Sequence, residues 1–272
     1  MGLCSVAGVA LHHTAAIDSA NDFRPLFAQM QRAVKPNDAA LGTYLWMPGM
    51  LNSYAPELTP QLRWHVDDVT PENENARLTP IVANHNTIWV FNFLRDPDAA
   101  QTTAVAGLKR RVWSVDRAAA GNMSVLQFSQ ASTPTSAPAQ VVVFADVIEL
   151  STWTMHEHAG GAALNGEPWG LPLTWRALRP ISEDLAVFIH VRDCAGNLRA
   201  QQDSDLINGL RPLFTLTAGE RVTETRFVVV PYMQWDGPLN FDVGVYRRSD
   251  GTRLRTREGK DAVRVPSLAK CS

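Results

Sequence analysis

The sequence predicts an α/β domain followed by an all-β domain, and three observations lead to this fold class. Helical and strand patterns alternate in the first half, the helical period disappears in the second, and a small, polar, proline-bearing stretch separates them. At 272 residues the chain also exceeds the usual size of one domain. We therefore expect a three-layer α/β (Rossmann-like) domain at residues 18–130, a linker at 131–140 and an antiparallel β-sandwich at 141–268.

Two helices and one strand carry the α/β prediction. Apolar residues recur at helical spacing over residues 23–34, after Asp22, which can cap that helix. Thr70 can cap a second helix that has Pro71 at its first position. The segment Thr87–Leu94 is an almost continuous apolar run, which indicates a central strand covered on both faces. We expect further strands at 39–44, 61–66, near 112 and near 125, and a helix at 97–110.

The linker and the strands beyond it carry the sandwich prediction. Residues 129–140, with the sequence SQASTPTSAPAQ, are typical of an extended connection. Phe241, Val243 and Val245 alternate with polar or small residues, so that they share one face of a strand. Glycine-containing turns at 193–197 and 249–251 fit hairpins. We expect strands at 141–150, 173–177, 185–191, 221–230 and 241–246.

Charge and motif content exclude several functions. The formal net charge of −2 leaves no basic excess for a phosphate backbone, so we expect no nucleic-acid partner. The sequence has no G-x-G-x-x-G fingerprint, P-loop or G-x-S-x-G elbow, and we expect no cofactor.

The cysteines and the first residues say little about the compartment of the protein. Three cysteines are too few for a disulfide framework or a zinc site, and the sequence leaves their redox state open. The apolar run Leu3–Leu11 is about half a membrane span and lacks the basic flank of a signal peptide. Such a start also fits a fragment that follows a membrane helix.

Several motifs resemble parts of a known family. The stretches 22–26 (DFRPL), 34–38 (VKPND) and 85–90 (HNTIWV) are similar to an extramembrane domain of bacterial membrane glycosyltransferases, the protein-mannosyltransferase-like enzymes of the GT-C class. The second half resembles a β-sandwich appended to such proteins, and departs from its pattern at Leu216 and Glu224, where Trp and Asp are expected. The matching stretches there are 173–177 (LTWRA), 187–193 (VFIHVRD), Gly196, 202–203 (QD), 208–209 (NG), 219–220 (GE) and 243–246 (VGVY).

The resemblance implies an accessory role beside a membrane glycosyltransferase. The family holds its catalytic carboxylate on a loop between membrane helices, and the sequence offers no counterpart of that loop. The resemblance therefore implies a non-catalytic module on the extracytoplasmic face of a bacterial membrane. Its partners would be a glycan or polyprenyl-linked sugar and a membrane glycosyltransferase.

Two sets of residues are candidates for chemistry. Asp67 and Asp68 resemble acidic pairs that hold Mg²⁺ for nucleotide-sugar donors beyond a strand end, although such a pair also fits a plain turn. They support an alternative function, a soluble sugar-processing enzyme (glycosyltransferase or hydrolase). His156 and His158 have a spacing that can hold zinc, but no third ligand is close in sequence, and a solvated loop explains them as well.

Aromatic residues are the candidates for carbohydrate binding. Trp169 lies in an NGEPWG context, and Tyr232 and Trp235 lie in YMQWDG, which both suggest loops. An exposed indole can stack on a sugar ring, whereas one folded back would cover the sandwich. Trp175 alternates with apolar residues and is expected in the core. A structural spacer is the second alternative function for the whole chain.

His190 and three neighbouring polar residues suggest a structural cluster. His190 lies in the middle of an apolar strand pattern, which favours a hydrogen-bonded core histidine over a catalytic one. Asp193, Gln202 and Asp203 could join it in a buried polar cluster that fixes a hairpin.

Overall fold

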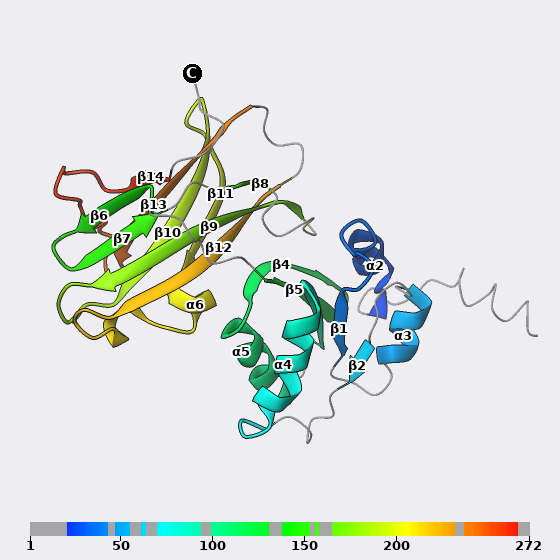
Figure 1. Ribbon diagram of the computed structural model, residues 1–272. Helices are drawn as coiled ribbons and strands as arrows, with labels where there is room; N and C mark the ends of the chain where they lie inside the picture. The colour runs from blue at the N-terminus through cyan, green and yellow to red at the C-terminus, as the bar shows by residue number, and fades with distance from the viewer. Residues whose placement is uncertain are drawn as a thin grey trace, which may run out of the picture.

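The computed structural model describes residues 21–42, 47–54, 61–63, 70–93, 99–130, 138–152, 156–157, 165–231 and 237–265 (Figure 1). In this part of the chain strands dominate and form three sheets. The strands of one sheet lie between residues 39 and 129, and those of the other two lie between 140 and 265. Among the described residues, no helix has the length and apolar character needed to cross a membrane.

The first sheet, called the mixed sheet here, has the strand order β2-β1-β3-β5-β4. β1 pairs in parallel with β2 and β3, whereas β5 is antiparallel to both β3 and β4. An all-parallel, doubly wound arrangement is therefore not shown, and the Rossmann-like part of the prediction is not supported. The strands are β1 Ala39–Gly42, β2 Gln61–Arg63, β3 Thr87–Phe93, β4 Trp113–Ala120 and β5 Met123–Ser129.

Helices cover both faces of the mixed sheet because its strands are apolar on both sides. In β3, Trp89 and Phe91 join the side chains of α2 and α3 in one buried cluster, whereas Ile88 and Val90 join those of α4 and α5 in another. This confirms the expected central strand. The helices are α2 Arg24–Met30, α3 Met47–Tyr54, α4 Glu74–Asn84 and α5 Ala99–Lys109.

Both predicted helix caps are wrong. Helix α2 begins at Arg24 after Phe23, and the Asp22 carboxylate instead binds the backbone N–H of Arg24 at 3.2 Å and its guanidinium at 2.8 Å. Helix α4 begins only at Glu74, since residues 71–73 form a turn. In that turn the side-chain oxygen of Asn73 accepts the Thr70 N–H at 3.0 Å. Asp22 thus bonds to Arg24 without capping the helix, and at α4 the side-chain bond comes from Asn73 and not from Thr70.

The second half contains two antiparallel sheets that enclose one apolar core, as predicted for a sandwich. We call them the β9 sheet, with the order β12-β9-β7-β6 and β8 paired to β9, and the β10 sheet, with the order β11-β10-β13-β14. Trp175, Phe241, Val243 and Val245 are buried in the core as expected. The strands of the β9 sheet are β6 Gln140–Phe144, β7 Ile148–Thr152, β8 His156–Glu157, β9 Gly166–Ala177 and β12 Arg221–Pro231. Those of the β10 sheet are β10 Leu185–Asp193, β11 Leu198–Ser204, β13 Leu239–Arg247 and β14 Val263–Val265.

The predicted single strand at 141–150 is in fact a hairpin. β6 and β7 pair through a turn in which Ala145 and Asp146 have φ of 48° and 52°. Two successive positive φ values suit the twist of a tight hairpin. The turn contains no glycine, so the sequence of this segment did not predict a turn.

Residues of both halves meet at β4. Val115 and Trp113 of β4 contact Phe227 and Val229 of β12 in a small apolar cluster. Asn208, in the short helix α6 (Leu206–Gly209), donates from Nδ2 to the carbonyl oxygens of Lys109 at 3.0 Å and Val112 at 3.1 Å. The two halves are therefore docked through specific contacts. The predicted boundaries at 130 and 141 stay a prediction, and residues 131–137 of the expected linker lie outside the described residues.

Asn165 makes a second set of contacts to β4. Its Nδ2 donates to the Asp116 carboxylate at 3.0 Å and to the Arg117 carbonyl at 2.7 Å, and its backbone N–H donates to Asp116 at 2.8 Å. Gln29 of α2 completes the set by donating to Asn165 Oδ1 at 2.7 Å. We refer to the contacts of Asn165 and Asn208 with β4 and α2, together with the apolar cluster, as the junction.

A buried ion pair supports the loop that carries Asn208. Arg226 and Glu224 of β12 are 4% and 1% exposed and pair at 2.7 Å. The Glu224 carboxylate also accepts the Trp175 indole N–H at 3.0 Å and the Ile207 backbone N–H at 2.8 Å. Ile207 and Asn208 both have positive φ, 52° and 57°, which is costly for Ile, so this loop is held by its contacts.

Candidate functional site

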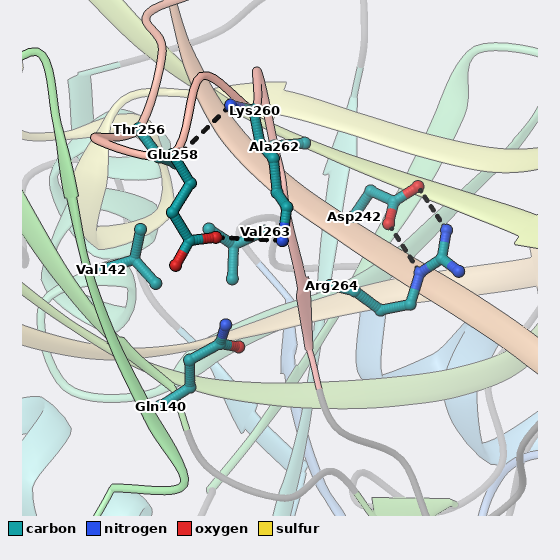
Figure 2. Close-up of a pocket in the computed structure, with 9 residues that line it drawn as sticks. All are labelled: Gln140, Val142, Asp242, Thr256, Glu258, Lys260, Ala262, Val263 and Arg264. Atoms are coloured by element: carbon teal, nitrogen blue, oxygen red, sulfur yellow. Dashed lines mark hydrogen bonds and ion pairs between the residues drawn. The ribbon is translucent and has the colours of Figure 1, made fainter.

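The described part of the chain contains a pocket of about 350 Å³ at one edge of the sandwich (Figure 2). It lies between β6 and β14, which are end strands of the two different sheets. Nearby, Phe144 of β6 forms an isolated bridge with Thr256, in the connection between β13 and β14. The pocket is lined by Gln140, Val142, Asp242, Thr256, Glu258, Lys260, Ala262, Val263 and Arg264.

One side of the pocket has a fixed acceptor. The Asp242 carboxylate receives Arg264 Nε at 3.0 Å and also lies 3.9 Å from Arg192 Nε. Its side chain is only 18% exposed, whereas that of Arg264 is 60% exposed. Asp242 is therefore held in place by two cations while part of the guanidinium of Arg264 faces solvent.

The other side of the pocket has an adaptable pair. Glu258 and Lys260 pair at 3.0 Å, and their side chains are 75% and 69% exposed. An ion pair in such exposure contributes little to stability, so both groups can change partners at low cost. The Thr256 hydroxyl accepts the Lys260 backbone N–H at 3.2 Å and orders the turn that carries them.

Apolar groups lie among these polar side chains. Val142, Ala262 and Val263 contribute methyl groups to the lining, and the Gln140 amide adds both a donor and an acceptor. A lining of mixed donors and acceptors around apolar contacts suits a ligand that carries several hydroxyl groups on a carbon ring. No group of three or more His, Cys, Asp or Glu side chains able to hold a metal is found among the described residues.

Trp169 does not lie in a loop, and that expectation is wrong. It belongs to β9, is only 4% exposed and packs on Phe241 with ring centroids 5.1 Å apart. β9 begins at Gly166, so Trp169 shares the inward face with Leu171, Leu173 and Trp175. The even spacing to Trp175 was the available signal, and the neighbouring proline hid it. In this structure the indole offers no open face to a sugar.

Most other predicted site residues belong to segments that the structure does not describe. Asp67, Asp68, His158, Tyr232 and Trp235 lie outside the described residues. The backbone of His156 lies in β8 and pairs with Gly170, but its side chain is outside the description as well. The acidic pair, the zinc site and the roles of Tyr232 and Trp235 therefore stay predictions.

His190 lies on the outer face of the β10 sheet, so the expectation of a core histidine is wrong. Its Nδ1 is 3.4 Å from Arg253 Nη2, and its ring packs beside Phe188. Burial, followed by the charge of Arg253, lowers the pKa of His190 below its usual value. An arginine can only donate, so Nδ1 accepts and the neutral ring carries its proton on Nε2.

The expected polar cluster around Asp193 has other members. The Asp193 carboxylate accepts the Asn197 side-chain amide at 3.0 Å, the Asn197 backbone N–H at 2.8 Å and Arg199 at 2.6 Å. These bonds, that of the Asn197 side chain first, lower the pKa of Asp193 to about 2. They fix the β10–β11 turn as predicted, but without Gln202 or Asp203. Cys194 in the same turn is disulfide-bonded.

No protein-family model matches the chain, and no curated protein matches it significantly. The solved structures it is similar to include a β-glucuronidase of Bacteroides uniformis, with a TM-score of 0.26, 12% identity and coverage of 49% of this chain and 18% of that one. A β-glucosidase from Listeria innocua gives a TM-score of 0.24, 16% identity and coverage of 44% and 16%. An endonuclease/exonuclease/phosphatase protein from Beutenbergia cavernae gives a TM-score of 0.20 and 10% identity, with coverage of 68% of this chain and 59% of that one.

These likenesses are too distant to assign a family. The chain spans less than two thirds of the length of each protein. The described residues form an antiparallel β-sandwich docked on a mixed α/β unit, with a polar pocket at the open edge of the sandwich.

Proposed function

We propose that this chain is a non-catalytic accessory module of a membrane glycosyltransferase system, of extracytoplasmic type, and that it binds a glycan between β6 and β14. The observation that carries the proposal is the lining of the pocket, in which the fixed Asp242–Arg264 pair and the adaptable Glu258–Lys260 pair face apolar side chains. Sugars present hydroxyl groups that both donate and accept, together with apolar C–H faces. The lining matches both features.

Two further features support the proposal. The junction holds the sandwich against the α/β unit, which suits a module that presents a ligand in a set direction. The disulfide at Cys194 fits an oxidising compartment, as expected for the extracytoplasmic side of a membrane.

Titration calorimetry with a panel of neutral mannose, glucose and galactose oligosaccharides tests this function. We expect one of them to bind with a dissociation constant of roughly 0.1–1 mM, the range of a few hydrogen bonds with modest apolar contact. Asp242→Ala and Arg264→Ala should each weaken binding several-fold. Arg257→Ala is the matched control, because Arg257 forms an exposed pair with Asp146 and does not line the pocket.

Three results would contradict this proposed function. If no saccharide binds the parent chain, or if the pocket variants bind as well as Arg257→Ala, the pocket is not a glycan site. Hydrolysis or transfer of a sugar by the chain that disappears in an Asp67→Asn, Asp68→Asn double variant would instead establish a sugar-processing enzyme.

A further inference from the structure

A row of polar side chains continues from the pocket across the outer face of the β10 sheet. The register of the strands aligns Arg264 of β14 with Asp242 of β13, Asp242 with His190 of β10, and His190 with Gln201 of β11. Residues on either side of these positions in β10, β13 and β14, such as Ile189, Val243 and Val263, point into the core. The four polar side chains therefore share the outer face, and we call them the outer row.

The outer row begins at the pocket itself. Arg264 and Asp242 line both, so a ligand that leaves the pocket along the sheet meets His190 next and Gln201 last. Arg192 lies beside the row, where its Nε approaches Asp242, and Arg253 borders it at His190. Gln201 and Arg264 at the two ends are exposed, and the two central residues are partly buried.

Each member of the outer row offers a defined hydrogen-bonding group. Asp242 is an acceptor, Arg264 a donor, the neutral His190 ring a donor at Nε2, and the Gln201 amide both. The charges around the row are compensated, because three cations face three carboxylates. Arg264 and Arg192 both approach Asp242, Arg253 pairs with Asp261 at 3.0 Å, and Asp203 lies on the same face, where its charge acts on His190. Balanced charge with alternating donors and acceptors is complementary to an uncharged, polyhydroxylated ligand rather than to a polyanion.

The spacing of the strands sets the length of that ligand. Neighbouring strands lie about 4.8 Å apart, so the three steps from β14 to β11 span roughly 14 Å. A single sugar ring in the pocket would not reach Gln201, whereas an oligosaccharide would.

We propose that the outer row is the binding surface of an extended, uncharged oligosaccharide, which runs across the strands from the edge pocket to Gln201. This inference rests on the proposed glycan-binding function and adds the length, the direction and the charge class of the ligand. The pocket holds one end of the chain, and each further residue of the row contacts a further part of it.

The test compares ligands of one, two and four units from the neutral oligosaccharide series that binds the parent chain, by titration calorimetry. We expect affinity to rise about tenfold or more from one unit to four. Gln201→Ala should lower the affinity for the four-unit ligand three- to tenfold and leave that for the single unit unchanged, because Gln201 lies at the far end of the row. Gln201 is exposed, so this variant should unfold at the parent temperature.

The matched control is Thr223→Ala. Thr223 lies exposed on the outer face of the other sheet, where it shares a hydrogen bond of 2.9 Å with Thr174. This variant should bind all ligands as the parent does. A four-unit acidic ligand, tetragalacturonate, should bind more weakly than the neutral series at the same length.

The outcomes separate this inference from the proposed function. If single units bind and longer ligands bind no more tightly, the outer row is not a binding surface, although the pocket still is. The same conclusion follows if longer ligands bind more tightly but Gln201→Ala does not reduce that gain in affinity. Tighter binding of tetragalacturonate than of the neutral four-unit ligand would overturn the inference that the ligand is uncharged. The absence of binding by every saccharide would overturn the glycan-binding function itself.

Discussion

The side-chain oxygen of Asn208 accepts the backbone N–H of Ser114 at 3.2 Å, and this bond joins residues 94 positions apart in the two halves of the chain. With its two donated bonds, the Asn208 amide satisfies three backbone groups in and before β4. One side chain therefore fixes much of the geometry of the junction.

Asn208→Gly should destabilise the protein by about 1–3 kcal/mol, since it leaves three backbone groups without their partner. Glycine accepts the positive φ of this position, so the loss reports on the side chain alone. Asn37→Gly is the matched control, because Asn37 is exposed and also has a positive φ of 72°. Denaturant unfolding measures both, and equal effects of the two variants would contradict the role given to Asn208.

Arg226→Met should cost about 3–5 kcal/mol, because it leaves the Glu224 carboxylate buried without its cation. Adding Glu224→Gln should recover part of this loss, since the uncompensated charge is then removed. Arg257→Met, in an exposed pair, should cost less than about 1 kcal/mol. The free energies of unfolding of the parent and the three variants are measured, and a double variant no more stable than Arg226→Met would refute the explanation.

Gly107→Ala should destabilise the α/β unit by about 1–3 kcal/mol through overpacking. A Cβ at Gly107 would lie 2.5 Å from the Glu74 carboxyl carbon and 2.6 Å from Leu78 Cδ1. Glu74 cannot easily move, because it pairs with Arg111 at 2.7 Å and with Arg110 at 2.5 Å. Gly49→Ala in α3 meets open space and should instead gain about 0.5–1 kcal/mol. Thermal unfolding should therefore shift in opposite directions for the two variants.

Acidification from pH 7.5 to 5.5 should destabilise the protein through His190. Its folded pKa is lowered, first by burial and then by Arg253, so the unfolded chain binds the proton more readily. The stability it contributes is present above the unfolded pKa near 6.5 and falls as the pH drops below that value. Arg192 opposes protonation as well, while Asp203 and Asp242 favour it. In His190→Gln the slope of unfolding free energy against pH should be smaller, and an unchanged slope would remove His190 as its source.

The sequence predicted those parts of the fold whose pattern is local. β3 was identified because its residues are apolar on both faces, and β13 because Phe241, Val243 and Val245 alternate. The β6–β7 turn was missed because Ala145 and Asp146 adopt positive φ without a glycine to announce it. Trp169 was misplaced because Pro168 lies next to it within a strand.

The candidate site could not be predicted in the same way. Its lining comes from residues 140–142, 242 and 256–264, which only the pairing of β13 with β14 and the meeting of the two sheet edges bring together. The Asn208-Gly209 motif was the one sequence signal of the junction, but its partners at 109–114 lie at the end of α5 and the start of β4, far away in the chain. Register and docking are long-range properties, and periodicity within one segment does not encode them.

The junction also bears on how the chain avoids aggregation. β4 is the last strand of the mixed sheet, and an end strand presents backbone groups that can template the addition of a strand from another molecule. Asn208 occupies the Ser114 N–H and Asn165 occupies the Arg117 carbonyl, so two side-chain amides close this edge where a further strand would bind. A truncation that removed the sandwich would uncover a ready nucleus for intermolecular β-structure. The sandwich thus covers part of the end strand of the mixed sheet and withholds it from such pairing.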